Sequence, residues 1–196
     1  NYLLCEVFVV AKTKFWDIET QKAIKGRFYH VDGILYHLKD SVAAGFRKEG
    51  SIYKKGDVVR VCLHKEGYLY FTFYNNGHKL NLFVHRVVWF LEYGTQVERI
   101  DHIDQDKTNN RPSNMREATE QQNQFNVSKK KACHSKYKGV SLSPSKKKPW
   151  KAYIVINRKN IHLGYFETEV EAAKAYDRAA HEIVGEYAYL KKKKRG

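Results

Sequence analysis

An acidic residue and a histidine stand together at Asp101-His102, near the start of residues 99–126, RIDHIDQDKTNNRPSNMREATEQQNQFN. A histidine takes a proton from water near neutral pH, as a general base must. A hard divalent cation such as Mg²⁺ prefers oxygen ligands, which Asp101 and nearby asparagine amides supply. Such an ion stabilises charge on a phosphate and on a leaving oxygen. The residue types therefore predict metal-assisted attack on a phosphodiester.

The elements that must position this pair are predicted from the surrounding pattern. A short apolar-leading run before Asp101 indicates the end of a strand, and a polar loop rich in Asn, Asp and Arg follows it. Thr119 and Gln122 have the spacing of a capping box, which predicts that a helix begins there. The segment therefore reads as strand, long loop and helix.

A helix is also expected upstream of the motif, over residues 85–93, HRVVWFLEY, ended by Gly94. Its core-facing residues are expected to be Val88, Leu91 and Trp89. His85 opens this helix, and of a catalytic and a structural role we favour the structural one.

Residues 56–84 predict a β-meander, with strand-like runs DVVRVCLH, YLYFTFY and KLNLFV and an Asn-Gly hairpin signal at Asn76-Gly77. The aromatic side chains are expected in the core rather than stacked on bases. Residues 1–55 are expected to form a β-rich region with a buried strand in LLCEVFVVA and short strands in GRFYHVDGILYHL. This region is either a DNA-contacting lobe or a small cap with solvated lysines, and we favour the cap.

A second unit is expected over residues 137–190. It has three strand-like runs, YKGVSLSP, WKAYIVIN and KNIHLGYF, followed by a helix that opens at a Thr168–Glu171 capping box and ends at Gly185. The face of this helix toward the sheet is expected to carry Ala172, Ala173, Tyr176, Ala180 and Ile183. Residues 127–136 read as a basic linker, and residues 191–196 as a basic tail with no structure of its own.

The composition indicates a polyanionic partner. The chain has 196 residues, 42% hydrophobic and 14% aromatic, and a formal net charge of +15, for which nucleic acid is the default partner. An anionic membrane surface is the competing partner, but no long basic amphipathic helix supports it. Three scattered cysteines, Cys5, Cys62 and Cys133, fit a reducing compartment. We expect a cytoplasmic protein that is not secreted, inside a bacterial host if a phage encodes it.

The motif resembles the His-Asn-His (HNH) nuclease motif of phage and intron-encoded homing endonucleases. The resemblance implies two strands and a helix around one Mg²⁺ or Mn²⁺ ion. It assigns His102 as the general base and Asp101 as the first metal ligand. Asn114 matches the central asparagine that ties the loop together and steadies the histidine, and Asn123 matches the second metal ligand.

The second unit resembles the APETALA/ethylene-response-factor DNA-binding domain, through YKGV, WKAYI, IHLGYF and TEVEAAKAYDRAAHEIVGEYA. That family lays its three-stranded sheet in the major groove. Plant relatives carry arginines at several positions where this chain has Ser, Val or Asn, so their target sequence does not transfer, and a protein-contacting sheet is the alternative. The candidate DNA contacts are Lys138, Ser141, Ser143, Trp150, Lys151, Tyr153, Val155, Lys159, Asn160 and His162.

These expectations combine into one hypothesis. The fold class is α+β: residues 1–55 lead into a ββα-metal nuclease domain over 56–126, followed by a three-stranded antiparallel sheet packed on one helix. The function is site-specific nicking of double-stranded DNA by a monomer. Arg111 and Arg116 either contact phosphates near the cut or pair with the acids Asp104, Asp106 and Glu117. The alternatives are a DNA-binding regulator with an inactive motif and an RNA-directed or recombination-associated nuclease.

Overall fold

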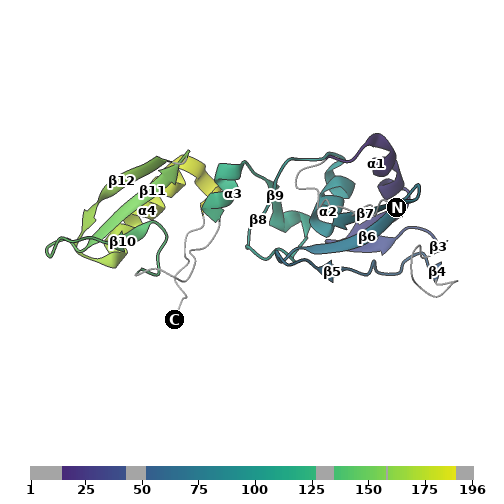
Figure 1. The fold of residues 1–196 in the computed structure, drawn as a ribbon, viewed down its shortest axis with the longest axis horizontal. Coiled ribbons are helices and arrows are strands. Elements are labelled where there is room, and N and C mark those ends of the chain that lie inside the picture. Colours follow the sequence, from purple (N-terminus) through teal and green to yellow (C-terminus); the bar gives the residue numbers. More distant parts are fainter. Residues whose placement is uncertain (1–14, 43–51, 127–134, 158, 189–196) are drawn as a thin grey trace, which may run out of the picture. The chain divides into compact units, whose positions relative to one another are not determined.

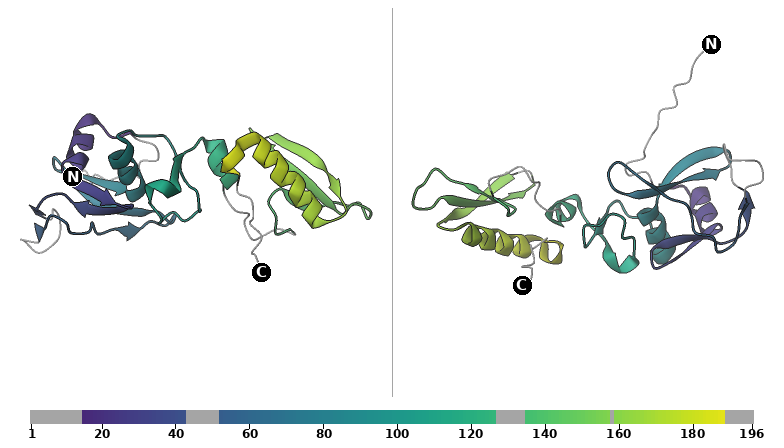
Figure 2. Two further views of the ribbon diagram at one scale, coloured as in Figure 1. Left: turned by 180° about the vertical axis from the view of Figure 1, so that it is seen from behind. Right: turned by 90° about the horizontal axis from the view of Figure 1, so that it is seen from below.

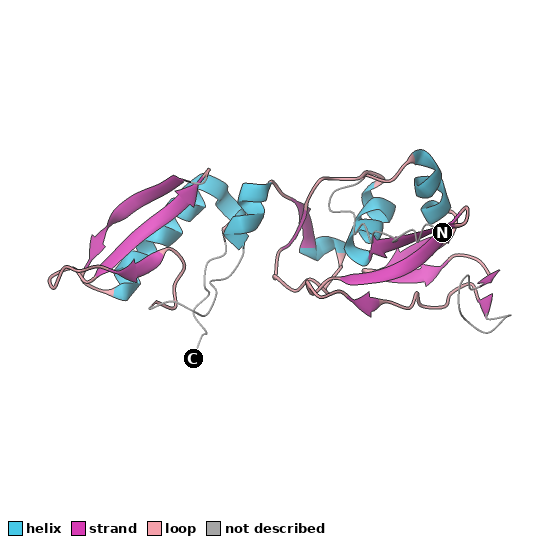
Figure 3. Cartoon of the chain, viewed as in Figure 1, coloured by secondary structure: helices cyan, strands magenta, loops and turns pink. Residues whose placement is uncertain are grey.

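The computed structural model describes residues 15–42, 52–126, 135–157 and 159–188, and it divides into two compact units, 1–117 and 118–196. Each unit mixes helices with small antiparallel sheets (Figures 1 and 3), which confirms the expected α+β class. No helix in the described ranges combines the length and the apolar character that a membrane crossing needs. The expected strand in LLCEVFVVA, most of the linker, and the tail lie outside the described residues.

The first unit begins with a helix that the sequence reasoning missed. α1 (Ile18–Lys25) starts at Asp17, whose carboxylate accepts a hydrogen bond from the backbone N–H of Thr20 at 2.7 Å, and it buries Thr20 and Ile24. Only a few apolar residues mark its inner face, so its hydrophobic periodicity is weak. The N-terminal region, expected to be β-rich, thus contains a helix beside its short strands.

Small antiparallel pairings build the rest of this unit. The hairpin β1 (Phe28–Val31) and β2 (Ile34–His37) confirms the short strands expected in GRFYHVDGILYHL. A second pair is β3 (Ser41–Val42) with β4 (Ile52–Tyr53). The meander is β5 (Cys62–Leu63), β6 (Leu69–Asn75) and β7 (His78–Phe83). Its first strand is shorter than expected, because Val58 bridges to Tyr36 of β2 instead.

Helix α2 (Val84–Tyr93) lies at the centre of the core and ends at Gly94 with a φ of 72°, as expected. It packs against β6 and β7 (Figure 1). Val88 and Trp89 are buried and Leu91 is half-buried. The same core contains Phe28 and Leu35, so the expected domain boundary at residues 55 and 56 does not divide the core. The strands β8 (Ile100–His102) and β9 (Met115–Glu117), with the 3-10 turn η1 (Pro112–Asn114), complete the unit.

The second unit consists of α3 (Glu120–Asn126), the strands β10 (Val140–Leu142), β11 (Trp150–Ile156) and β12 (Lys159–Phe166), α4 (Glu169–Val184) and the 3-10 turn η2 (Gly185–Tyr187). Figure 2 shows α4 running along one face of the antiparallel sheet. The capping box at Thr168 is present as expected. Ala172, Ala173, Tyr176 and Ala180 are buried, whereas Ile183 is exposed, which corrects the expected helix face.

Candidate active site and nucleic-acid surface

The β8–β9 pair places the Asp-His pair inside the first unit. All three residues of β8 are buried, and the register sets Asp101 opposite Arg116 and His102 opposite Met115. Ile100 and Met115 belong to the hydrophobic core. The site is therefore anchored by apolar side chains on both strands.

Asp101 is 3% exposed, and its charge is balanced by Arg116. The Nε and Nη2 atoms of Arg116 each lie 2.9 Å from Oδ2 of Asp101. From the sequence, Arg116 was expected to contact a DNA phosphate or to pair with an acid of the loop or with Glu117. In the structure its partner is Asp101. The cause is the antiparallel register, because residues directly opposite each other on neighbouring strands bring their side chains together.

His102 is also buried, and its Nε2 lies 3.1 Å from Oδ1 of Asn110. An amide oxygen only accepts, so Nε2 is the donor in this contact. Burial lowers the pKa of His102 below its ordinary value, although the bond to Asn110 and the nearby Asp104 act in the opposite direction. The neutral ring that a general base requires is therefore favoured.

Asn114 ties the loop together, as the resemblance implied. Its amide donates to Oδ1 of Asp104 and to the carbonyl of Asn109, both at 2.9 Å, and its own Oδ1 accepts from the N–H of Asp104 at 3.1 Å. The side chain that bonds His102 is Asn110, which the sequence reasoning did not single out. Several asparagines stand in this loop, and nothing in their order marks which one faces the histidine.

A second imidazole lies beside the first. The rings of His85 and His102 are 5.5 Å apart, edge to face, and the ring of Tyr68 is 4.8 Å from that of His85. The Nδ1 atom of His85 is buried without a hydrogen-bond partner in the structure. Burial, followed by the neighbouring His102, holds the pKa of His85 well below its ordinary value. His85 is thus a neutral wall of the site, which fits the structural role expected for it.

Arg111 is exposed and pairs with Asp32 at the tip of the β1–β2 hairpin, with Nε 2.8 Å from Oδ2. The acids expected from the sequence as partners of Arg111 were all near it in the chain. Asp32 is far from Arg111 in the chain and was not among them. The hairpin that carries Asp32 comes from the region expected to be a small cap. It contacts residues 103–114 between β8 and β9, which we call the active-site loop.

The residue types at this site fit a hard cation. Asp101 and Asn123 offer oxygen atoms, the ligands that Mg²⁺ prefers. Asn123 lies on α3 in the second unit, so its role as the second ligand stays a prediction. The described residues hold no group of three His, Cys, Asp or Glu side chains suited to a metal. A cation at Asp101 would share the carboxylate with Arg116.

The helix start at Thr119 is confirmed. The backbone N–H of Thr119 donates to Oε1 of Gln122 at 2.8 Å, and that of Gln122 donates to the hydroxyl of Thr119 at 3.2 Å. Near the other end of α3, Nζ of Lys138 donates to the carbonyl of Gln124 at 2.6 Å and to that of Phe125 at 3.2 Å. Burial lowers the pKa of Lys138 to about 8. Lys138 therefore caps this helix, and its role as a DNA contact stays a prediction.

The register of the second unit's sheet decides which candidate residues share a face. Lys151 pairs with Ser141 and Tyr165, Tyr153 pairs with His162, and Val155 pairs with Asn160. Directly paired residues point to the same side of a sheet. One face, which we call the open face, therefore carries Ser141, Lys151, Tyr153, Val155, Asn160, His162 and Tyr165.

Several candidates fall elsewhere. Trp150 pairs with Leu142 and Phe166 and packs against the core under α4, so it lies off the open face, and its role as a DNA contact stays a prediction. Lys159 pairs with Ile156 at the strand end, and Ser143 lies just after β10, where its hydroxyl accepts from the N–H of Ser145. Tyr165, which is 50% exposed, was missed because the register shift between Gly164 and His162 breaks the alternation along β12 and brings Tyr165 to the open face.

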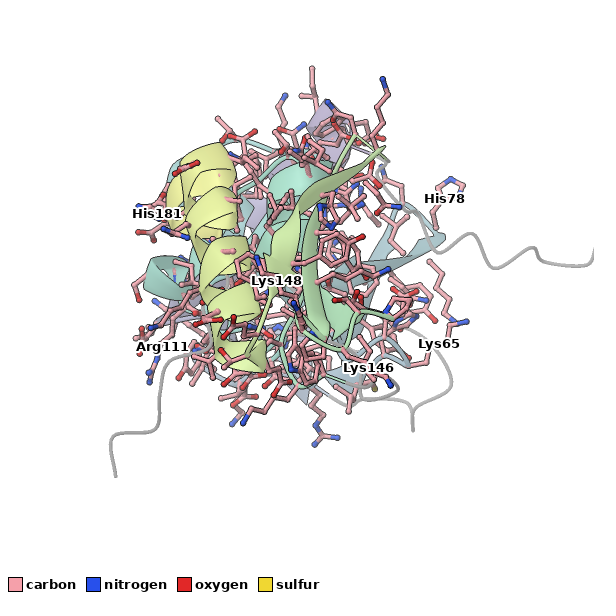
Figure 4. All side chains as sticks on the ribbon, turned by 90° about the vertical axis from the view of Figure 1, so that its left-hand side faces the viewer. Lys65, His78, Arg111, Lys146, Lys148 and His181 are labelled. Carbon is pink, nitrogen blue, oxygen red and sulfur yellow. The ribbon has the colours of Figure 1, made fainter. Side chains whose placement is uncertain are left out.

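The loop between β10 and β11 adds positive charge at one end of this sheet. Lys146, Lys147 and Lys148 are all exposed, and Figure 4 labels two of them. Exposed lysines of this kind are typical of phosphate-tracking surfaces. The open face and this loop together form the candidate nucleic-acid surface.

Comparison with known proteins supports the nuclease assignment. Residues 82–125 match the family model described as HNH endonuclease. The chain is 40% identical over 89 residues to the uncharacterized HNH endonuclease L560 of Acanthamoeba polyphaga mimivirus, covering 45% of this chain and 44% of that protein. The matched family segment contains Asp101, His102 and Asn123. The comparisons therefore support an enzyme with an HNH nuclease segment.

Two further proteins resemble this chain. The chain is 46% identical over 56 residues to APETALA2-like protein 2 of Oryza sativa subsp. indica, which is 28% of this chain and 12% of that protein. A solved structure titled "DNA binding and cleavage by the HNH homing endonuclease I-HmuI" aligns at 23% identity and a TM-score of 0.40, over 54% and 53% of the two chains. The chain spans less than half the length of both sequence relatives.

Proposed function

We propose that this chain is a metal-dependent HNH endonuclease that hydrolyses a phosphodiester of duplex DNA. The observation that carries the proposal is the buried Asp101-His102 pair, in which Asn110 contacts one ring nitrogen of the histidine. The family match over residues 82–125 and the net charge of +15 support the same chemistry. A buried, oriented and neutral histidine is what a general base needs.

The chain's own residues have separate tasks in this reaction. His102 takes a proton from water, while the amide oxygen of Asn110 contacts Nε2 and orients the ring. The water oxygen then bonds to phosphorus and the bond from phosphorus to the 3′-oxygen breaks. The 3′-oxygen takes a proton from solvent, which leaves a 5′-phosphate and a 3′-hydroxyl. Arg116 orients the carboxylate of Asp101. Tight positioning of these groups supplies much of the rate.

Asp101 and Asn123 would hold one Mg²⁺ or Mn²⁺ ion in this proposal. When bound, the ion supplies positive charge next to the scissile phosphate and the leaving oxygen. Oxygen donors of the carboxylate and amide type suit both ions.

The second unit supplies DNA affinity in this proposal. The open face carries a lysine, two tyrosines and a histidine, and the lysine loop adds charge at its end. Such a sheet suits the major groove, which admits β-strands. Because the two units are unlike, an extended asymmetric site and a monomer that nicks one strand follow.

The first experiment incubates supercoiled plasmids that carry fragments of the source genome with the protein and Mg²⁺. We expect an open-circle product that disappears with EDTA and with His102→Ala, while His78→Ala, an exposed histidine at the β6–β7 turn, retains it. Linear product would replace the nickase with two cuts. Equal cleavage by wild type and His102→Ala would remove His102 from the mechanism.

The second candidate is a DNA-binding regulator whose nuclease motif is inactive. The observation that favours it is the Asp101–Arg116 pair, because a guanidinium already balances the carboxylate expected to bind the metal. This candidate moves ahead if calorimetry shows no Mg²⁺ or Mn²⁺ binding and a verified binding site stays uncut.

A further inference from the structure

The tip of the β1–β2 hairpin makes an unusually close backbone contact. Asp32 and Gly33 form the two-residue turn, with φ values of 50° and 85°. Positive φ at both central positions is typical of the tight turn that joins twisted antiparallel strands. Most hairpin tips are solvated, but Gly33 is buried. Something therefore covers it.

The active-site loop covers Gly33. A Cβ atom placed on Gly33 would lie 2.5 Å from both the carbonyl carbon and the oxygen of Asn110, and 2.7 Å from the backbone nitrogen of Arg111. These are backbone atoms, so no side chain can rotate away to make room. The hairpin tip thus lies directly on the peptide that joins Asn110 to Arg111.

The side chains next to this contact also join the hairpin to the loop. Asp32 pairs with Arg111 at 2.8 Å, next to the contact of Gly33. Both side chains are about 60% exposed, so the pair adds little stability, but it fixes where the loop meets the hairpin. The side chain of Asn110 points inward and is 4% exposed, with its oxygen on Nε2 of His102.

We propose that the β1–β2 hairpin tip is a brace for the active site, in which Gly33 is a positioning residue that keeps the Asn110 oxygen on His102. Gly33 touches no reacting atom and acts only through Asn110. The brace rests on the proposed function and extends it. If Asn110 were displaced, its oxygen would no longer hold the proton of the His102 ring on Nε2. The first part of the chain, far from the motif in sequence, then helps to set its geometry.

Gly33→Ala tests this brace, with Gly56→Ala as the matched control. Gly56 has a φ of 89°, almost that of Gly33, and nothing lies within 4 Å of its Cβ position. Both variants place an alanine at a similar positive φ, but only Gly33→Ala meets the Asn110 peptide. We expect kcat of Gly33→Ala to fall about tenfold or more, since a small displacement of a catalytic group is costly, with Kd for DNA within twofold.

Nitrogen-15 NMR of the His102 ring supplies a readout that does not depend on cleavage. We expect a single Nε2–H form in wild type and in Gly56→Ala, and a mixture of ring forms in Gly33→Ala. Wild-type ring signals together with wild-type kcat in Gly33→Ala would overturn the brace. If no DNA is cut by wild type, the proposed function fails, while the ring signals still decide the brace.

Asp32→Asn keeps the test decisive if Gly33→Ala does not fold. Asparagine tolerates the positive φ at this position, so the turn is retained while the charge is removed. We expect the Asn110 amide and His102 ring signals to shift in Asp32→Asn. If both stay unmoved, the hairpin does not position Asn110.

Discussion

Asp101 and Arg116 face each other across the β8–β9 pair, and two nitrogens of the guanidinium reach the same carboxylate oxygen at 2.9 Å. Both side chains are largely buried. Removal of one partner from a buried pair leaves a charge in a poor environment, which costs about 3 kcal/mol or more. The pair thus links the stability of the first unit to its chemistry.

Arg116→Gln should destabilise the first unit by about 3 kcal/mol in urea unfolding. Mg²⁺ should then stabilise the variant more than wild type, because the cation replaces the lost positive charge. Arg60→Gln, at an exposed position, is the control and should change stability by less than about 0.5 kcal/mol. Equal Mg²⁺ effects on the variant and wild type would show that the ion does not bind at Asp101.

The activity of the enzyme should persist below pH 6.5. His102 must be unprotonated to accept a proton, and burial lowers its pKa from 6.5. A bound divalent cation would lower this pKa further, since like charges repel. The acid limb of kcat/KM against pH should therefore have its midpoint under 6.5. A midpoint above that value would exclude His102 as the general base.

The first unit should lose stability as pH falls below 6.5, in part through His85. The pKa of His85 is well below 6.5 in the folded state. On acidification His85 therefore binds a proton in the unfolded chain but not in the folded chain. The free energy of unfolding then falls by up to about 1.4 kcal/mol per pH unit for this group, until pH reaches the folded pKa.

His85→Phe keeps a ring of similar shape and should reduce that slope, as measured by urea unfolding between pH 7 and pH 5. His78→Gln is the control, and Figure 4 shows His78 projecting into solvent. An unchanged slope in His85→Phe would contradict the burial of a neutral His85.

Gly139→Ala should unfold the second unit selectively. Gly139 has a φ of 67°, and a Cβ there would lie 2.0 Å from Cδ2 of Tyr176 and 2.4 Å from the carbonyl oxygen of Tyr153. We expect a loss of at least about 2 kcal/mol in this unit. Gly185→Ala, with positive φ but open space at Cβ, is the matched control and should cost less. Equal costs would show that crowding at Gly139 is not decisive.

Lys151 and Lys138 should differ in how they affect DNA binding. Lys151 lies on the open face, so Lys151→Ala should reduce the salt dependence of binding by about one phosphate contact. Lys138 donates to the carbonyls of Gln124 and Phe125, so Lys138→Ala should lower the stability of the second unit and leave the salt slope unchanged. The reverse pattern, measured by fluorescence titration at several salt concentrations, would overturn the assignment of the two lysines.

The local elements were predictable because their causes are local. Four features each depend on residues within four positions of one another: the Asn76-Gly77 turn, the end of α2 at Gly94, and the capping boxes at Thr119 and Thr168. Helix α1 was not predicted because it has few apolar residues on its buried face. The expected boundary at residue 55 failed for a different reason: it followed a change in pattern, whereas the core joins Phe28 with Phe71.

The sequence by itself determined which chemical groups are present: an Asp-His pair at a strand end, a loop rich in amide side chains, and a basic chain suited to a polyanion. Tertiary structure decided the partners. Strand register set Arg116 against Asp101, the loop's path set Asn110 on His102, and the hairpin tip brought Gly33 to the same loop. Such contacts join residues distant in the chain, and many side chains of the same type compete for them. Only the packing of the backbone selects among these competitors.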